Sequence, residues 1–321
     1  MASNPAASLR LALCGLALVV PALSAAAESP GEWLQRMSNA VQTTDYEGTV
    51  IRLSNGRVEA LKVVHAVSDG VVRERLIAQE GSGLEIIRNG NEVHCILPEQ
   101  QSVLVEEWND QSTLFSTLPS NSVRFGSEYD VSIVREDRVA GRKTVLIAIR
   151  PHDEYRFGHR IWLDTATGFP LQTRLIDEAG AALQEVKFAD ISLGREILAS
   201  ALKPSYSTEN FTWFTQPGRK VTPIVDSDWQ NDRLPTGFRM LSAQQEVLPD
   251  SKQAVVHLLY SDGLASVSVF IAEHDGKSYT ERSSIGPSNS YSTVIGAFRV
   301  TAVGNVPAQT VEQIASSMVL R

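Results

Sequence analysis

The stretch of sequence that decides the fold is residues 46–97, YEGTVIRLSNGRVEALKVVHAVSDGVVRERLIAQEGSGLEIIRNGNEVHCIL. Runs rich in β-branched residues alternate here with the turn signals Asn55-Gly56, Asp69-Gly70 and Asn89-Gly90. Such pairs favour the tight turns of β-hairpins, because these residues tolerate positive backbone φ angles. Turns this close together leave no room for the helical crossover that a parallel sheet needs. The stretch therefore predicts an antiparallel meander.

The same alternation continues to about residue 191, which extends the expected meander to eleven strands. The expected strands are Tyr46–Leu53, Val58–Val67, Val71–Gln79, Leu84–Arg88, Glu92–Leu97, Ser102–Trp108, Tyr129–Val139, Lys143–Arg150, His159–Asp164, Pro170–Asp177 and Ala182–Ile191. Both alternating sets of residues in Lys143–Arg150 are apolar, so this strand is expected to be buried on both faces.

Two short helices are expected to cover the concave face of this sheet. The first follows Ser29-Pro30-Gly31-Glu32, which offers a capping serine, a proline at the first helical position and a glutamate three residues after the cap. The second is expected over Asp110–Leu118, where leucine and phenylalanine recur at helical spacing. A large sheet under two short helices leaves either a packed core or an apolar cavity, and the sequence does not distinguish between them.

A smaller second domain is expected beyond an irregular segment that begins near Arg195. The expected elements are strands at Gly237–Val247, Ala254–Tyr260, Leu264–Ala272, Tyr291–Ile295 and Ala297–Val303, and a final helix with a capping box at Thr310 and Gln313. About 90 residues suffice for a small α+β domain with its own core. We therefore expect a large domain over 28–205, a linker over 206–232 and a small domain over 233–321.

The first residues predict export. Arg10 precedes the apolar run Leu11–Leu23, and the small residues Ser24-Ala25-Ala26-Ala27 follow it. This run is short for a membrane span, and its small-residue exit is typical of a cleavage site. We expect residues 1–27 to be a signal peptide, with an uncleaved anchor as the alternative. Cys95 is then the one cysteine of the mature chain, so an intrachain disulfide is excluded and a small buried side chain is expected.

Composition and motifs argue against nucleic-acid binding and catalysis. The 321 residues carry 29 basic and 37 acidic side chains, a net charge of −8, which gives no basic face for phosphate contacts. G-x-S-x-G, H-E-x-x-H, G-x-G-x-x-G after a strand and P-loop motifs are absent from the sequence. His152, Asp153 and His159 could in principle ligate a metal, but a polar loop between two strands has the same composition. We expect no metal, no cofactor and no nucleic-acid partner.

Motifs spread along residues 30–320 resemble the RseB/MucB family. They are His65 with Ser68-Asp69-Gly70, Arg73-Glu74-Arg75-Leu76, Glu85-Ile86-Ile87-Arg88-Asn89-Gly90, Arg138-Val139-Ala140-Gly141-Arg142, Pro151-His152-Asp153 with Tyr155-Arg156-Phe157-Gly158, Trp162-Leu163-Asp164 with Thr167-Gly168-Phe169-Pro170-Leu171, Leu234-Pro235-Thr236-Gly237-Phe238, and Tyr260-Ser261-Asp262-Gly263-Leu264 with Ser268-Val269-Phe270. Each motif is weak by itself. Their order and coverage make the resemblance specific.

The resemblance implies an α+β protein with a large N-terminal domain like the lipoprotein carriers LolA and LolB. That domain is an open antiparallel β half-barrel with covering helices, and a smaller α+β C-terminal domain follows it. The implied function is negative regulation of the sigma-E (AlgU-type) envelope-stress response in the periplasm. The family binds the periplasmic region of a transmembrane anti-sigma factor, RseA or MucA, and shields it from the site-1 protease, DegS or AlgW. Lipopolysaccharide or mislocalised lipoprotein then releases the bound factor.

Two groups of site residues are expected under this resemblance, and neither is catalytic. Lipopolysaccharide or another acyl-chain ligand is expected in the large domain near Trp33, Met37, Leu114, Phe115, Val145 and Ile147. The anti-sigma partner is expected on the second domain and the interdomain groove around Tyr260, Asp262, Gly263, Leu264 and Phe270.

The main alternative is a periplasmic lipid or lipoprotein carrier of the LolA/LolB type without a regulatory partner. The residues after Asp232 argue against it, because a half-barrel alone would suffice for transport. A hydrolase built from Ser, His and Asp residues distant in sequence is a third hypothesis. A homo-oligomer is compatible with either binding function, and the sequence does not report one.

Overall fold

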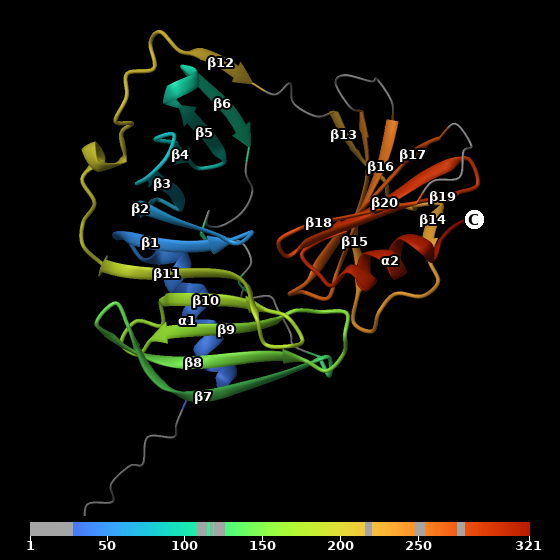
Figure 1. The fold of residues 1–321 in the computed structure, drawn as a ribbon, viewed down its shortest axis with the longest axis horizontal. Coiled ribbons are helices and arrows are strands. Elements are labelled where there is room, and N and C mark those ends of the chain that lie inside the picture. Colours follow the sequence, from blue (N-terminus) through green and yellow to red (C-terminus); the bar gives the residue numbers. More distant parts are fainter. Residues whose placement is uncertain are drawn as a thin grey trace, which may run out of the picture.

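A computed structural model describes residues 28–107, 114, 115, 118, 126–215, 220–247, 254–274 and 280–321. The expected signal peptide, residues 1–27, lies outside the described residues. The described chain is mostly β-structure, with one sheet of twelve strands, one of seven and one of two. Figure 1 shows the two larger sheets as separate bodies beside each other. In the described part of the chain, no helix combines the length and apolar composition that a membrane span requires.

The twelve-stranded sheet contains all eleven strands expected from the sequence, with their ends shifted by two residues or fewer. They are β1 Tyr46–Ser54, β2 Arg57–Ser68, β3 Val71–Ala78, β4 Glu85–Asn89, β5 Glu92–Leu97, β6 Ser102–Glu107, β7 Tyr129–Val139, β8 Arg142–Pro151, β9 Gly158–Asp164, β10 Pro170–Ile176 and β11 Ala182–Leu193. The twelfth, β12 Thr212–Thr215, was not expected and pairs in parallel with β6. A short 3-10 helix, Pro98–Gln100, separates β5 from β6.

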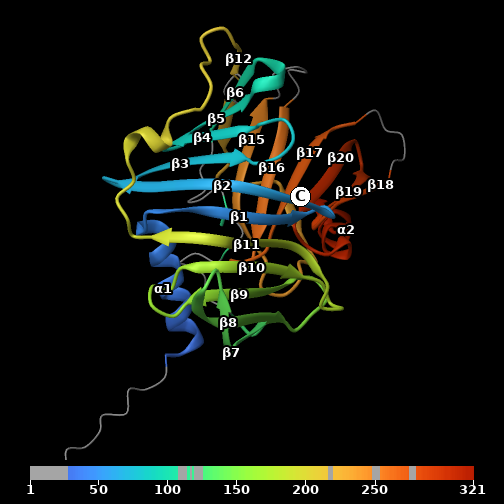
Figure 2. The same cartoon turned by 60° about the vertical axis from the view of Figure 1, so that its left-hand side comes forward.

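The sheet is built from two antiparallel meanders that meet in its middle. β1 to β6 run outward to one edge, and β7 to β11 run back from the other edge until β11 pairs with β1. Figure 2 shows this ladder from β12 and β6 at one edge to β7 at the other. The two edges belong to different strands that do not pair with each other, so the sheet is open, and the expected half-barrel is confirmed.

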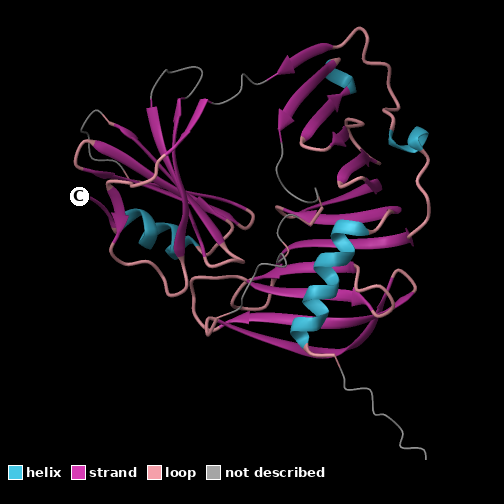
Figure 3. Cartoon of the chain, turned by 180° about the vertical axis from the view of Figure 1, so that it is seen from behind, coloured by secondary structure: helices cyan, strands magenta, loops and turns pink. Residues whose placement is uncertain are grey.

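One helix, α1 Pro30–Thr43, lies across one face of this sheet (Figure 3). The expected capping box is present, because Ser29 Oγ accepts from the Glu32 backbone N–H while the Glu32 carboxylate accepts from the Ser29 N–H at 2.6 Å. Trp33 and Met37 of α1 pack in one buried cluster with Ile147 of β8. The helix therefore covers the sheet through its apolar face.

Strand β8 is buried on both faces, as its sequence predicts. Val145, Ile147 and Ile149 join the cluster beneath α1, whereas Leu146 belongs to a second cluster that contains Trp162. The helix expected over residues 110–118 falls mostly outside the described residues. Leu114, Phe115 and Leu118 of that segment are described, and none of the three is helical. Leu114 and Phe115 are buried against the sheet.

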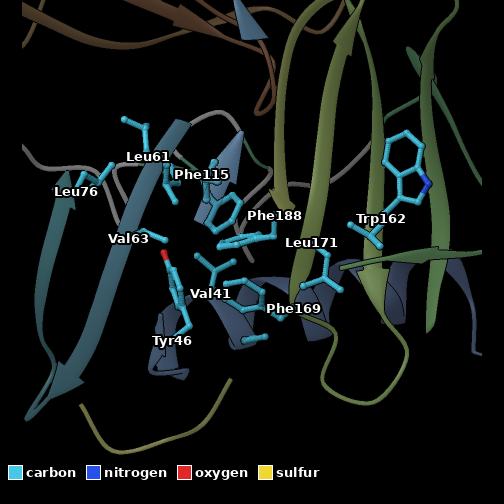
Figure 4. Packing of buried hydrophobic residues seen from close by; sticks show 14 of the residues in the cluster. Val41, Tyr46, Leu61, Val63, Leu76, Phe115, Trp162, Phe169, Leu171 and Phe188 are labelled. Atoms are coloured by element: carbon cyan, nitrogen blue, oxygen red, sulfur yellow. The ribbon is translucent and has the colours of Figure 1, made fainter. Parts of the chain in front are cut away.

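Aromatic side chains form the centre of the large domain. The rings of Tyr46, Phe115, Phe169 and Phe188 lie with centroids 4.8 to 6.4 Å apart, in tilted and edge-on arrangements. Figure 4 shows these rings between the strands and α1, with Val41 beside them. Aromatic pairs at such distances add stability beyond the area that they bury.

The second domain packs α2 Ala308–Ser316 against a seven-stranded sheet. Its strands are β13 Lys220–Pro223, β15 Arg239–Val247, β16 Ala254–Ser261, β17 Ser266–Glu273, β18 Glu281–Ile285, β19 Ser288–Ile295 and β20 Phe298–Gly304, and β14 Trp229–Asn231 pairs separately with β21 Met318–Leu320. The five expected strands are confirmed, whereas β13, β14, β18 and β21 were missed. A 3-10 helix, Ala199–Leu202, precedes the segment that joins the domains.

The expected capping box of α2 is wrong. The residue before the helix is Pro307, which has no side chain that can cap it, and the helix begins at Ala308. Thr310 and Gln313 instead donate to carbonyl oxygens outside the helix, those of Tyr155 and Arg233. Tertiary partners therefore decide the roles of these two side chains.

We expect Phe169→Ala to destabilise the protein by about 3 to 5 kcal/mol, because Phe169 is fully buried and its removal leaves a cavity among three other rings. Urea unfolding followed by tryptophan fluorescence measures this change. Phe214→Ala is the matched control, since that ring is 53% exposed and its loss should change the unfolding free energy by about 1 kcal/mol or less. Equal losses in the two variants would contradict this description of the core.

Candidate functional site

An apolar cavity of about 480 Å³ opens between β1, β2, β3 and β4 of the large domain. Its volume lies within the range of small-molecule sites in proteins. Its apolar lining comes from aliphatic side chains of three strands and the β3–β4 turn: Val58, Ala60, Leu61, Leu76, Ala78, Leu84 and Ile86. Arg52 and Glu59 also line it and form an ion pair at 2.6 Å, each more than 40% exposed. The cavity thus combines a hydrocarbon-like interior with charged groups that reach solvent.

The residues expected to bind lipid do not line this cavity. Trp33, Met37, Val145 and Ile147 are 0 to 9% exposed and belong to the packed cluster beneath α1. Leu114 and Phe115 lie in the central cluster, and Leu114 also lines a smaller cavity of about 190 Å³ with His159. The structure therefore places the six residues in two packed regions. Their contact with lipid stays a prediction.

Sequence reasoning missed the cavity because each of its residues looks like an ordinary strand residue. The available signal was the small side chain of Ala78 beside the Gly81-Ser82-Gly83 turn. Small residues beside a glycine-rich turn leave part of the concave face unfilled. Leu61 and Leu76 nevertheless join the central aromatic cluster, so the cavity is continuous with the core.

A buried polar row crosses the sheet close to the cavity. Tyr46, His65, Glu74 and Arg88 occupy directly opposed positions on β1, β2, β3 and β4. His65 Nδ1 lies 3.0 Å from Glu74 Oε1, and the His65 ring stacks on Tyr46 at 4.6 Å. All four side chains are 0 to 4% exposed. A buried polar group without a hydrogen-bond partner is unfavourable, and a shift in strand pairing would separate these side chains. The row therefore favours the observed register of the four strands.

A second candidate site joins the two domains around Arg156, in the loop between β8 and β9. The Arg156 side chain is completely buried, and its Nε donates to Asp262 Oδ2 of the second domain at 2.5 Å. Its two terminal nitrogens donate to the Asp153 carboxylate and to the Thr236 carbonyl oxygen. Tyr129 completes the group, because its hydroxyl donates to the same Asp262 oxygen at 2.8 Å. We call Arg156, Asp153, Tyr129 and Asp262 the ionic junction.

The ionic junction is surrounded by aromatic and apolar groups from both domains. The guanidinium lies over the Phe238 ring at 4.9 Å and near the Tyr129 ring at 5.5 Å. Leu264 of the second domain packs against the cluster beneath α1. Burial raises the pKa of the Tyr129 hydroxyl, and the Asp262 charge raises it further, so this group stays a proton donor. Burial lowers the pKa of Arg156, but hydrogen bonds to Asp262 and Asp153 outweigh this and raise it.

The residues expected to bind the partner are divided among three environments. Asp262, Gly263 and Leu264 form the β16–β17 turn, which docks on the large domain through the ionic junction. Tyr260 is buried in the core of the second domain, and its hydroxyl lies 3.6 Å from Met318 Sδ. Phe270 stacks on His257 at 4.5 Å. A shared role of the five in partner binding stays a prediction.

Two groups with potential catalytic chemistry lie among the described residues, around His257 and at Cys95. His257 lies 3.0 Å from both Ser268 Oγ and Glu246 Oε1, which is the spacing of a catalytic triad. Ser268 is in the middle of β17, which is paired on both edges, so backbone amides are not free to form an oxyanion hole there. Burial raises the pKa of Cys95 to about 11, which keeps its thiol protonated and unreactive at neutral pH. Among the described residues, no group of three potential metal ligands is present.

The fold and the two candidate sites define a two-domain protein: an open, mostly antiparallel sheet with an apolar cavity, joined by a buried ionic contact to a second sheet domain. Residues 29–206 match the MucB/RseB N-terminal domain, and residues 223–319 match the MucB/RseB C-terminal domain. The chain therefore belongs to the MucB/RseB family, whose curated relatives are sigma-factor regulatory proteins.

Curated relatives match along nearly their whole length. The sigma factor AlgU regulatory protein MucB of Pseudomonas aeruginosa is 32% identical over 314 residues, which cover 96% of each chain. The sigma-E factor regulatory protein RseB of Escherichia coli is 26% identical over 305 residues, which cover 94% of each chain. A crystal structure of MucB in complex with periplasmic MucA is 30% identical, covers 91% of this chain and 99% of that one, and has a TM-score of 0.69. A further crystal structure of MucB is 28% identical, covers 91% of this chain and 98% of that one, and has a TM-score of 0.56.

His159 should make stability depend on pH. Burial lowers its pKa from 6.5 to about 4, and the nearby Asp262 charge offsets part of that effect. The unfolded chain then binds a proton near pH 6.5 that the native chain binds only near pH 4. The stability associated with the neutral ring is thus complete above pH 6.5 and is lost as the pH falls.

We expect the wild-type chain to lose about 2 kcal/mol of stability through His159 between pH 7.5 and pH 5. His159→Gln removes this proton site, so its unfolding free energy should fall less over the same interval. Urea unfolding of both proteins at the two pH values measures the difference. Equal losses in the two proteins would show that His159 is not held neutral.

Proposed function

We propose that this chain is a periplasmic negative regulator of a sigma-E-type envelope-stress response. It binds the periplasmic region of a transmembrane anti-sigma factor of the RseA/MucA kind and shields it from site-1 proteolysis. Lipid or lipopolysaccharide releases the factor. The observation that carries the proposal is the likeness, over 91% of the chain, to MucB structures that contain periplasmic MucA.

Release by lipid requires linkage between two binding events. A ligand shifts a protein between two states only by its difference in affinity for them, and typical couplings are about 1 to 3 kcal/mol. An acyl chain gains about 0.8 kcal/mol for each CH₂ group that it buries. The 480 Å³ cavity and its apolar lining would supply this energy if lipid entered there.

The proposed location and partners follow from the same function. A sequence that begins with the expected signal peptide supports the periplasm as the location, and the anti-sigma factor would be met there. The net charge of −8 gives no support to nucleic-acid binding. Self-association of the chain stays a prediction, which analytical ultracentrifugation would test.

A protection experiment tests the proposed function. The purified periplasmic segment of the anti-sigma factor from the same organism is incubated with its site-1 protease, with and without this chain. We expect the chain to slow cleavage at least tenfold, and lipopolysaccharide to restore the original rate. Undiminished cleavage would contradict the regulator. Lipid transfer between vesicles without any protection would favour the carrier.

Filling the cavity should separate lipid sensing from partner binding. We expect Ala78→Trp to place an indole in the 480 Å³ cavity, weaken binding of a fluorescent fatty acid at least tenfold and leave protection insensitive to lipopolysaccharide. Protection without lipid should persist. Ile133→Trp is the matched control, because Ile133 is 41% exposed on β7 and does not line the cavity. Unchanged lipid binding in Ala78→Trp would exclude this cavity as the lipid site.

A further inference from the structure

The ionic junction pairs a buried cation of the large domain with carboxylates from both domains. The Arg156 side chain is completely buried and comes from the large domain, while Asp262, 2% exposed, comes from the second domain. Asp153 also pairs with Arg156 but remains 28% exposed. Separation of the domains would break the hydrogen bonds that Arg156 donates to Asp262 and to the Thr236 carbonyl oxygen, and the one that Tyr129 donates to Asp262. Because hydrogen bonds between charged groups are stronger than those between neutral groups, the junction favours the closed arrangement of the domains.

Asp262 has two separate tasks, one for each carboxylate oxygen. Its Oδ1 accepts from the backbone N–H groups of Leu264 and Ala265 at 2.9 and 2.8 Å, which holds the β16–β17 turn. Its Oδ2 accepts from Arg156 and Tyr129 across the domain boundary. The turn and the interdomain contact can therefore be disturbed separately.

Other contacts support the same arrangement but are uncharged. The Thr310 hydroxyl at the start of α2 donates to the Tyr155 carbonyl oxygen at 2.9 Å, next to Arg156 in the sequence. Elsewhere on the boundary, Gly286 of the second domain packs closely against Asn55 of the large domain. A Cβ atom built on Gly286 would lie 1.8 Å from Asn55 Oδ1. The ionic junction is thus the charged part of a wider interdomain contact.

Solved MucB structures resemble this chain to different degrees. At the same 91% coverage of this chain, the TM-score is 0.69 for two MucB structures that contain MucA and 0.56 for a further MucB crystal structure. The structure of this chain, in which Arg156 meets Asp262, is therefore more similar overall to the two that contain MucA.

We propose that Arg156 and Asp262 are positioning residues that hold the two domains in the arrangement that accepts the anti-sigma factor. This inference rests on the proposed function. The junction acts by pre-organisation, since a protein that spends only a fraction of its time in the competent arrangement binds its partner more weakly by that fraction. Arg156 and Asp262 need not touch the partner to have this effect.

Asp262→Asn is the sharpest test. The amide oxygen still accepts from Leu264 and Ala265, whereas the amide NH₂ group now faces the donors of Arg156 and Tyr129. We expect small-angle X-ray scattering of the free chain to show a larger radius of gyration than wild type. We also expect the Kd for the purified periplasmic anti-sigma segment, measured by calorimetry, to rise about tenfold to a hundredfold. Arg156→Met removes the partner of Asp262 in the large domain. It should raise the radius of gyration and the Kd as Asp262→Asn does.

Arg282→Gln is the matched control, because it breaks an exposed arginine pair with Glu312 that lies within the second domain. It should leave scattering and Kd at their wild-type values. The thermal transition of each variant shows that its domains remain folded. Wild-type scattering and wild-type Kd in folded Asp262→Asn would overturn the inference. Failure of the wild-type chain to bind the segment would instead contradict the proposed function, and the scattering comparison would still test the junction.

Discussion

The apolar concave face of the large sheet must be shielded from water. The position of helix α1, the aromatic cluster and the cavity all follow from how this face is covered. Twelve strands at about 4.8 Å spacing span about 53 Å along the curved sheet, whereas a helix of 14 residues is about 21 Å long. Helix α1 therefore covers only part of the face. The remainder is buried by Leu114, Phe115 and the aromatic cluster, and the cavity lies beside β2, β3 and β4 where this cover ends. Among the described residues, the cavity thus lies where α1 no longer covers the open sheet.

Charge has a different role from hydrophobic packing in this chain. The polar row of Tyr46, His65, Glu74 and Arg88 lies within one sheet, and it fixes which strand positions face one another. The ionic junction lies between two folded domains, and it favours one of their arrangements. In both places the low dielectric of the interior makes an unpaired group costly, so the paired state is selected. The polar interior of this protein therefore determines geometry more than it adds stability.

The two candidate sites lie in different parts of the large domain, which bears on how a lipid signal would reach a partner. The cavity opens near the β1–β2 turn, whose Asn55 also touches Gly286 of the second domain. The smaller cavity is lined by His159, whose pKa responds to the Asp262 charge. Both cavities are therefore close to contacts between the domains. A ligand that altered the domain arrangement would act through these contacts, and this requires no catalytic group.

The sequence alone determined the strands of the large sheet, the capped helix α1 and the burial of β8 on both faces. These features depend on local turn geometry, side-chain alternation and a capping box, each of which is complete within a few residues. It did not determine β12 or β18, which are short and exposed. β12 pairs with the distant strand β6, and β18 is an edge strand that forms a hairpin with β19. The motifs around Arg156, Phe238 and Asp262 carry the family resemblance, but the sequence does not indicate that these three residues meet. Arg156 and Asp262 are 106 residues apart, and only the tertiary structure brings a buried cation to its carboxylate.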